Sequence, residues 1–177
     1  MTALRRLRQG IRALFAFTQP VDFDLASSYL TVVQMALFRQ MRRSEQLHSL
    51  NVLRTVLVES AAQQSVPAEL TVAALLHDVG KSRFPLAVWQ KTLAVLVRAF
   101  APATFERLSS GDPHHMFQRP FVVNVQHPAW SAEMLAQTDA SPEAIWLVVH
   151  HADDAESLPA SDLVPLLKRL QHADDAN

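Results

Sequence analysis

Apolar residues recur every three or four positions along most of the chain, which is the spacing of one face of an α-helix. The first stripe runs beside several arginines near the start of the sequence. Later stripes predict a helix from after Pro20 to about Met41, with its apolar face inward, and a helix over about 86–100. The three stripes are Leu4, Leu7, Ile11 and Leu14; Phe23, Ala26, Leu30, Val33 and Leu37; and Leu86, Trp89, Leu93, Leu96 and Phe100.

Prolines and one glycine predict where other helices begin and end. A helix over about 44–64 is followed by Pro67, which suits a first helical turn because the N–H that proline lacks has no partner there. We expect the helix that Pro67 opens to end at Asp78, with Gly80 as its cap. After an irregular stretch, "SSGDPHHMFQRP", helices are predicted to resume near Pro128, Pro142 and Ser161.

The composition agrees with a single all-α domain built as a helical bundle. The sequence has only three glycines, 49% hydrophobic residues and no stretch that alternates like a strand. It contains no cysteine, which excludes disulfides and thiolate metal sites. The longest apolar runs are far shorter than the about 20 residues that cross a bilayer. We therefore expect a cytoplasmic protein.

Charge is distributed unevenly along the chain. Residues 1–43 contain seven arginines and two aspartates, whereas the whole chain has a net charge of −1. A basic segment can contact nucleic acid or a membrane surface, or it can pack on the acidic remainder of its own fold; we favour the second interpretation. We expect residues 1–43 to form N-terminal helices that pack on or extend a core domain of residues 44–177. The oligomeric state stays open.

Side chains that bind metals gather at the ends of the predicted helices. A buried carboxylate or imidazolium without a partner costs several kcal/mol, so such groups inside a bundle are expected to pair or to bind a cation. Imidazole and carboxylate without thiols suit iron, manganese, zinc or cobalt, and bundles can assemble two-metal sites from facing helices. The candidate ligands are His48, His77, Asp78, His127, His150, His151 and, at the end of the last helix, Asp174 or its neighbour Asp175.

Four of these residues resemble the signature of the HD-domain superfamily of metal-dependent phosphohydrolases. That signature is a helical His, an adjacent His-Asp pair and a distant Asp, here His48, His77 with Asp78, and Asp174. The string "HDVGK" is similar to the family's His-Asp-apolar-Gly-Lys form, and the resemblance covers roughly residues 44–176.

Two further segments, "QHPAWSAEML" and "VVHHADD", resemble the additional histidine motifs of the two-metal branch. By this resemblance one metal would be held by His48, His77 and Asp174 and the other by His127 and His150, with Asp78 as the bridge and His151 as a further candidate.

The chain also departs from two known patterns. It reads "HHADDAESLPASD" where the branch that cleaves cyclic dinucleotides continues into Gly-Tyr-Pro. Ser44, with Glu45 beside it, stands where some relatives have a glutamate that serves a third metal.

The resemblance implies an all-α hydrolase with two divalent metal ions, iron or manganese before zinc, magnesium, cobalt or nickel. The metals would activate a water for attack on a small phosphomonoester, phosphodiester or nucleotide. Asp78 and Lys81 would be catalytic, and Lys81 and Arg83 would contact the substrate. The alternatives are a two-iron oxygenase of the same superfamily and a non-catalytic domain that senses a ligand or serves as a scaffold.

Overall fold

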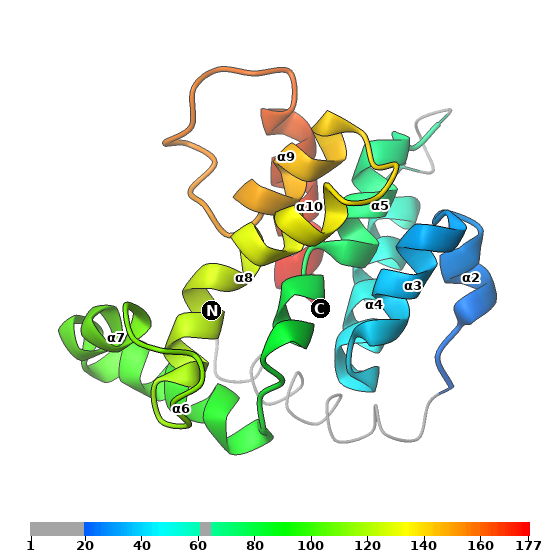
Figure 1. Ribbon diagram of the computed structural model, residues 1–177. Helices are drawn as coiled ribbons and strands as arrows, with labels where there is room; N and C mark the ends of the chain where they lie inside the picture. Colours follow the sequence, from blue (N-terminus) through cyan, green and yellow to red (C-terminus); the bar gives the residue numbers. More distant parts are fainter. Residues whose placement is uncertain (1–19, 61–64) are drawn as a thin grey trace.

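A computed structural model describes residues 20–60 and 65–177, and all of its regular elements in these ranges are helical (Figure 1). This confirms the predicted all-α class. The stripe at Leu4–Leu14 and the predicted helix end at Gln64 lie outside the described residues. The elements are α2 (Phe23–Ser27), α3 (Val32–Gln40), α4 (Arg43–Ser60), α5 (Ala68–Leu76), the 3-10 helix η2 (Val79–Arg83), α6 (Val88–Phe100), α7 (Pro102–Ser109), α8 (Arg119–Leu135), α9 (Pro142–His150) and α10 (Val164–Ala176).

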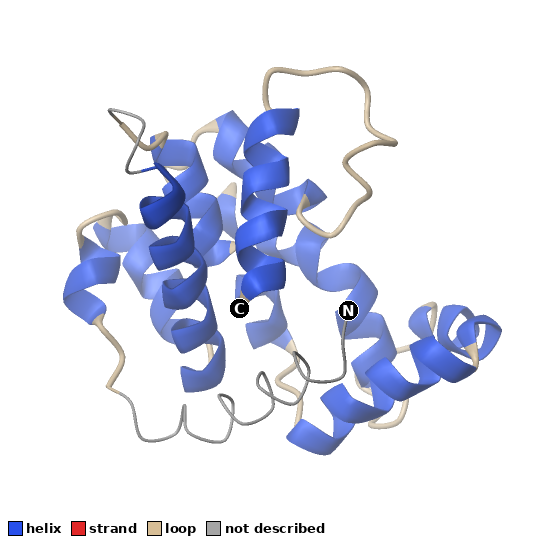
Figure 2. Ribbon diagram, turned by 180° about the vertical axis from the view of Figure 1, so that it is seen from behind, coloured by secondary structure: helices blue, strands red, loops and turns tan. Residues whose placement is uncertain are grey.

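Helix α5 forms the centre of the bundle. Every residue from Leu70 to Leu76 is buried and all but Thr71 are apolar, as expected of a core helix. Helices α4, α9 and α10 pack against it (Figures 1 and 2). The carboxyl end of α5 therefore delivers His77 and Asp78 directly into the interior, where both are buried.

The predicted helix from Pro20 to Met41 is two helices, α2 and α3. Thr31 interrupts it, because its hydroxyl accepts a hydrogen bond from the Gln34 N–H while the Gln34 side chain accepts one from the Thr31 N–H. This reciprocal arrangement starts a new helix rather than continuing the old one. Leu30 and Phe38 are still buried in the main core, whereas Val33 is 52% exposed, contrary to the predicted stripe. The predicted division into N-terminal helices of residues 1–43 and a core domain of residues 44–177 stays a prediction.

Helices α6 and α7 form a hairpin at one side of the molecule, with a small core of their own against α8 (Figure 1). The predicted helix over 86–100 is confirmed in position. Its apolar stripe, however, is turned largely to the surface: Trp89, Leu96 and Phe100 are exposed, while Ala94 is buried beside Phe105. In the part of the chain that the structure describes, no helix has the length and apolar character to cross a bilayer.

Pro128 does not begin a helix, contrary to the sequence prediction; it lies inside α8, which starts at Arg119 with Pro120 in its first turn. The irregular stretch before α8 is correspondingly shorter than predicted. The helix predicted near Pro142 is confirmed as α9, and the last helix begins at Val164.

Gly80 is needed for close packing rather than as a helix cap. Among the described residues no glycine has a positive φ, so the left-handed cap predicted after α5 does not form. Instead the Gly80 N–H donates to the Ser131 hydroxyl at 2.8 Å, which holds η2 against α8. A methyl group at Gly80 would lie 2.7 Å from the Ser131 nitrogen and closer still to the His127 carbonyl oxygen.

We expect Gly80→Ala to lower the free energy of unfolding by about 2 kcal/mol, because backbone atoms of α8 cannot move aside as a flexible side chain can. Thermal and urea unfolding would measure this loss. Gly111→Ala is the matched control, since a methyl group there would meet mainly the Gln118 side chain. Equal losses in the two variants would contradict the close-packing explanation.

Candidate metal centre

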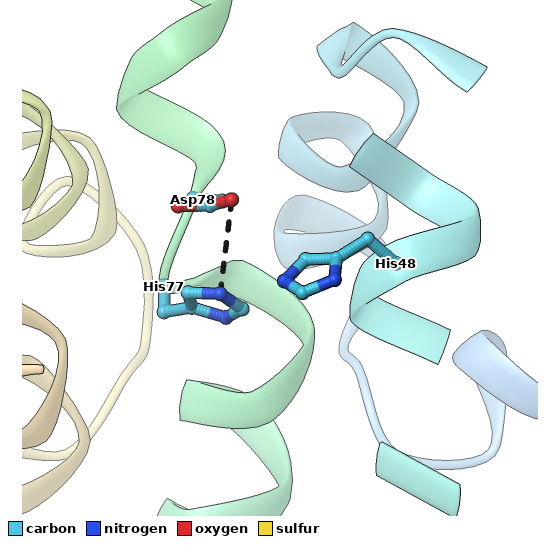
Figure 3. Close-up of side chains that lie close together, drawn as sticks. All are labelled: His48, His77 and Asp78. Carbon is cyan, nitrogen blue, oxygen red and sulfur yellow. Dashed lines mark ion pairs between the residues drawn. The ribbon is translucent and has the colours of Figure 1, made fainter. Parts of the chain in front are cut away.

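The ends or inner faces of five helices bring six imidazole and carboxylate groups into one cluster. Figure 3 shows three of them, with the His48 ring reaching from α4 toward the His77 ring and the Asp78 carboxylate at the end of α5. The others come from α8, from the turn after α9, and from α10. The cluster consists of His48, His77, Asp78, His127, His151 and Asp174.

Asp78 is shared between two groups of potential ligands. The ligand atoms of His48, His77 and Asp78 lie within 4.8 Å of one another, and so do those of Asp78, His127 and His151. One carboxylate oxygen, Oδ2, lies 3.8 Å from His77 Nε2. The other, Oδ1, lies 3.3 Å from His127 Nε2 and 3.9 Å from His151 Nε2. Each oxygen of Asp78 therefore faces a different group.

Asp174 joins the first of these groups. Its Oδ1 lies 2.8 Å from His48 Nε2 and 3.7 Å from His77 Nε2. The structure thus brings together the His, the His-Asp pair and the distant Asp that the sequence singled out. The cluster is more open to solvent at Asp174, whose side chain is 36% exposed, than at His77, whose side chain is 1% exposed.

Backbone carbonyls fix the orientation of three of the imidazole rings. In His77, His127 and His151 the Nδ1 atom contacts a carbonyl three or four residues earlier in the chain. Because a carbonyl oxygen can only accept, Nδ1 must carry the hydrogen, and Nε2 is left with its lone pair toward the cluster. This is the arrangement that orients metal-binding histidines. The carbonyls belong to Ala74, Val123 and Val148, at 3.2, 3.0 and 2.7 Å respectively.

These lone pairs point at one another. The Nε2 atoms of His127 and His151 are 3.2 Å apart, and neither carries a hydrogen to share. His77 Nε2 is buried and has no hydrogen-bond partner in the described part of the chain. Buried acceptors that face each other are unfavourable unless a cation lies between them. The residues present therefore fit a metal ion in each group.

Pro128 contributes to the orientation of His127. Because proline has no N–H, the carbonyl of Asn124, four residues earlier, loses its helical donor. The Nδ1–H of His127 lies 3.0 Å from this carbonyl and shares its hydrogen between it and Val123. The proline inside α8 thus frees an acceptor that holds the neighbouring imidazole in the metal-binding tautomer.

Burial keeps two of the rings neutral. It lowers the pKa of His151 to about 3, with the nearby His77 acting in the same direction. Burial also lowers the pKa of His127, assisted by the charge of Lys81. A neutral imidazole is the form that ligates a metal, so these two rings are ready to bind at neutral pH.

The first group, which contains His77, Asp78 and Asp174, is by contrast stabilised by positive charge. Burial lowers the pKa of His77, but the carboxylates of Asp78 and Asp174 outweigh it and leave that pKa above its ordinary value. Burial raises the pKa of Asp78, but Lys81 and then His77 hold it well below its usual range. The pKa of Asp174 is also lowered, since hydrogen bonding to His48 and the nearby imidazole of His77 together overcome the effect of burial. A divalent ion would supply the charge that these carboxylates favour.

The two candidate substrate contacts lie in different surroundings. Lys81 Nζ lies 2.6 Å from Asp78 Oδ2, at the cluster. Burial lowers the pKa of Lys81, but Asp78 raises it above the ordinary value, so the side chain stays an ammonium. Arg83 instead pairs with Glu133 at 2.8 Å on the surface of α8.

His150 lies outside both ligand groups. Its Nδ1 is 2.6 Å from Asp153 Oδ2, and its ring packs on Trp146 with centroids 4.6 Å apart. His151, the next residue, is the one whose ring enters the cluster. Gln171, which sequence reasoning missed, positions this turn by donating to the carbonyls of His151 and Asp153 at 3.1 and 2.7 Å. Gln171 could have been found from the sequence because it precedes the predicted ligand Asp174 by one helical turn.

The family model described as HD domain matches residues 47–176 of the chain. This range includes all six residues of the cluster. Comparisons with curated proteins and with solved structures gave no match.

Proposed function

Because this chain belongs to the HD-domain family, which matches it over residues 47–176, we propose that it is a phosphohydrolase with two divalent metal ions. The observation that carries the proposal is Asp78, whose two oxygens face two groups of converging ligands. The substrate class is a small phosphomonoester, phosphodiester or nucleotide. A cytoplasmic location belongs to the same proposal.

In this proposal His48, His77 and Asp174 would hold the first metal, His127 and His151 would hold the second, and Asp78 would be shared. Two divalent ions lower the pKa of water so that it can act as a nucleophile near neutral pH, and they hold the phosphoryl oxygens. A ligand set of imidazoles and carboxylates without thiols favours iron or manganese. His151 takes the place that the resemblance assigned to His150, because only His151 lies within ligand distance of Asp78 and His127.

Lys81 is the chain's own positive charge at the reaction site. Its ammonium group lies beside Asp78, and its raised pKa keeps it protonated through the neutral range. Such a group can donate hydrogen bonds to a phosphoryl oxygen and neutralise charge that develops there in the transition state. Arg83, which is paired with Glu133, has a lesser claim to this role.

Burial determines the side from which a substrate can approach. The side chains of His77, Asp78, His127 and His151 are each at most 8% exposed, whereas those of His48 and Asp174 are 28% and 36% exposed. The buried groups form a floor from which the protein excludes water. The substrate would enter from the side of α10.

A panel of phosphomonoesters, phosphodiesters and nucleotides, assayed with added manganese under strictly anaerobic conditions, tests the proposed function. We expect hydrolysis that continues without dioxygen and stops when a chelator removes the metal. Strict dependence on dioxygen would replace the proposal with the oxygenase alternative. Metal binding without turnover of any phosphoester, with or without dioxygen, would favour a ligand-sensing or scaffold domain.

A further inference from the structure

A cavity of about 490 Å³ lies between α10 and the loop that follows α9. Its lining includes His151 and Asp174, one member of each ligand group. The cavity is therefore continuous with the candidate metal centre and lies on the side from which the cluster is open.

Carboxylates dominate the wall of this cavity. Among the described residues of the lining, Lys168 is the only lysine or arginine, and it already pairs with Glu156 at 2.6 Å. Asp153 pairs with His150. Asp154 accepts the Glu156 N–H at 3.1 Å, and no basic side chain of the described chain pairs with it. The acidic residues of the lining are Asp153, Asp154, Glu156, Asp174 and Asp175.

At its inner end, near Asp174, the cavity meets the candidate metal centre and is more than an acidic surface. His77 Nε2, which is buried and has no hydrogen-bond partner among the described residues, lies 3.7 Å from Asp174, which lines the cavity. Lys81 adds a positive charge at the same end, through its contact with Asp78. With metal ions bound, the inner end is positive while the outer wall stays negative.

Resting on the proposed function, we propose that the substrate is an aminoalkyl phosphate, a phosphomonoester whose alcohol carries an ammonium group. Its phosphoryl group matches the inner end, and its ammonium matches the unpaired carboxylate of Asp154. A nucleoside triphosphate would instead place further phosphates against the acidic wall, where like charges repel. In the reaction, water adds to phosphorus, the P–O bond to the alcohol breaks, and the alkoxide takes up a proton from the water, which gives inorganic phosphate and an amino alcohol.

The test compares kcat/KM of the full chain with manganese on O-phosphoethanolamine, on its uncharged counterpart 2-hydroxyethyl phosphate, and on ATP. We expect O-phosphoethanolamine to be preferred over 2-hydroxyethyl phosphate by about fivefold at low salt, the size of one partly exposed ion pair, and ATP to be the poorest of the three. Asp154→Asn should bring that preference close to one without lowering kcat/KM on 2-hydroxyethyl phosphate. Added salt should reduce the wild-type preference in the same direction.

Asp162→Asn is the matched control, because Asp162 is an exposed carboxylate of the same loop that does not line the cavity. It should leave the preference unchanged. Equal rates on the two monoesters, a preference that survives Asp154→Asn, or faster hydrolysis of ATP would overturn the substrate class and leave the hydrolase proposal standing. No hydrolysis of any phosphoester would overturn both.

Discussion

Asp78→Asn should remove both bound metal ions and lower phosphoester hydrolysis by at least ~1,000-fold. Asparagine keeps the shape of the side chain but loses the negative charge that both ligand groups share. The carboxylate faces His77 with one oxygen and His127 with the other, so no other residue can substitute for it. In the wild-type protein the Lys81 ammonium lies 2.6 Å from the Asp78 carboxylate. The variant therefore also removes the negative charge that Lys81 pairs with.

Metal analysis of the purified variant and thermal unfolding with and without added manganese would measure this effect. A ligand that binds only the folded state at 100 times its Kd stabilises it by about 2.7 kcal/mol, so wild-type protein should gain stability with manganese and Asp78→Asn should gain none. The far-UV spectrum should stay helical. Asp162→Asn, which removes an exposed carboxylate elsewhere, should behave as wild type. Wild-type metal content in Asp78→Asn would contradict the assignment of the bridge.

The residues of the cluster could be predicted from the sequence because their chemistry is costly to bury. An imidazole and a carboxylate at the end of an apolar helix need a compensating charge. His77 and Asp78 follow seven buried residues of α5, and the last five of these, residues 72–76, were visible in the sequence as a continuous apolar run. The family signature supplied the distant Asp174, which no local pattern could connect to α5.

The errors in the fold have causes that the spacing of apolar residues does not reveal. Thr31 divides α2 from α3 through its own side chain, although the apolar pattern continues across it. Pro128 lies inside α8, because the loss of one backbone hydrogen bond there is offset by the bond from His127 to Asn124. The apolar stripe of α6 faces outward because, in the described part of the chain, the hairpin of α6 and α7 packs mainly on α8 and has only a small core to fill. The first two outcomes depend on hydrogen bonds between residues three apart in the sequence, and the third depends on tertiary packing.

The sequence could not distinguish His150 from His151 for a geometric reason. Consecutive residues of an α-helix point about 100° apart, so only one of two adjacent histidines can face the centre of a bundle. Which one does so depends on the rotation of α9 about its axis, and that rotation is set by packing of residues such as Leu147 and Val148 against the core. The structure turns His151 inward and leaves His150 with Asp153.

His151→Ala should lose about one metal ion per chain and lower hydrolysis by about 100-fold, whereas His150→Ala should keep both metals and most of the activity. His127→Ala should match His151→Ala, because the two rings supply the same group with Asp78. The first group keeps His48, His77 and Asp174 in all three variants, so the remaining metal should stay bound.

His150→Ala is the matched control, since it deletes the same side chain one residue earlier. It removes the packing of the ring on Trp146 and the partly exposed contact with Asp153, and the latter is worth less than about 1 kcal/mol of stability. Metal analysis and kcat/KM on one phosphomonoester would separate the variants. Loss of metal in His150→Ala together with full metal content in His151→Ala would mean that α9 is rotated by about one residue from the position described, and the second group would have to be rebuilt around His150.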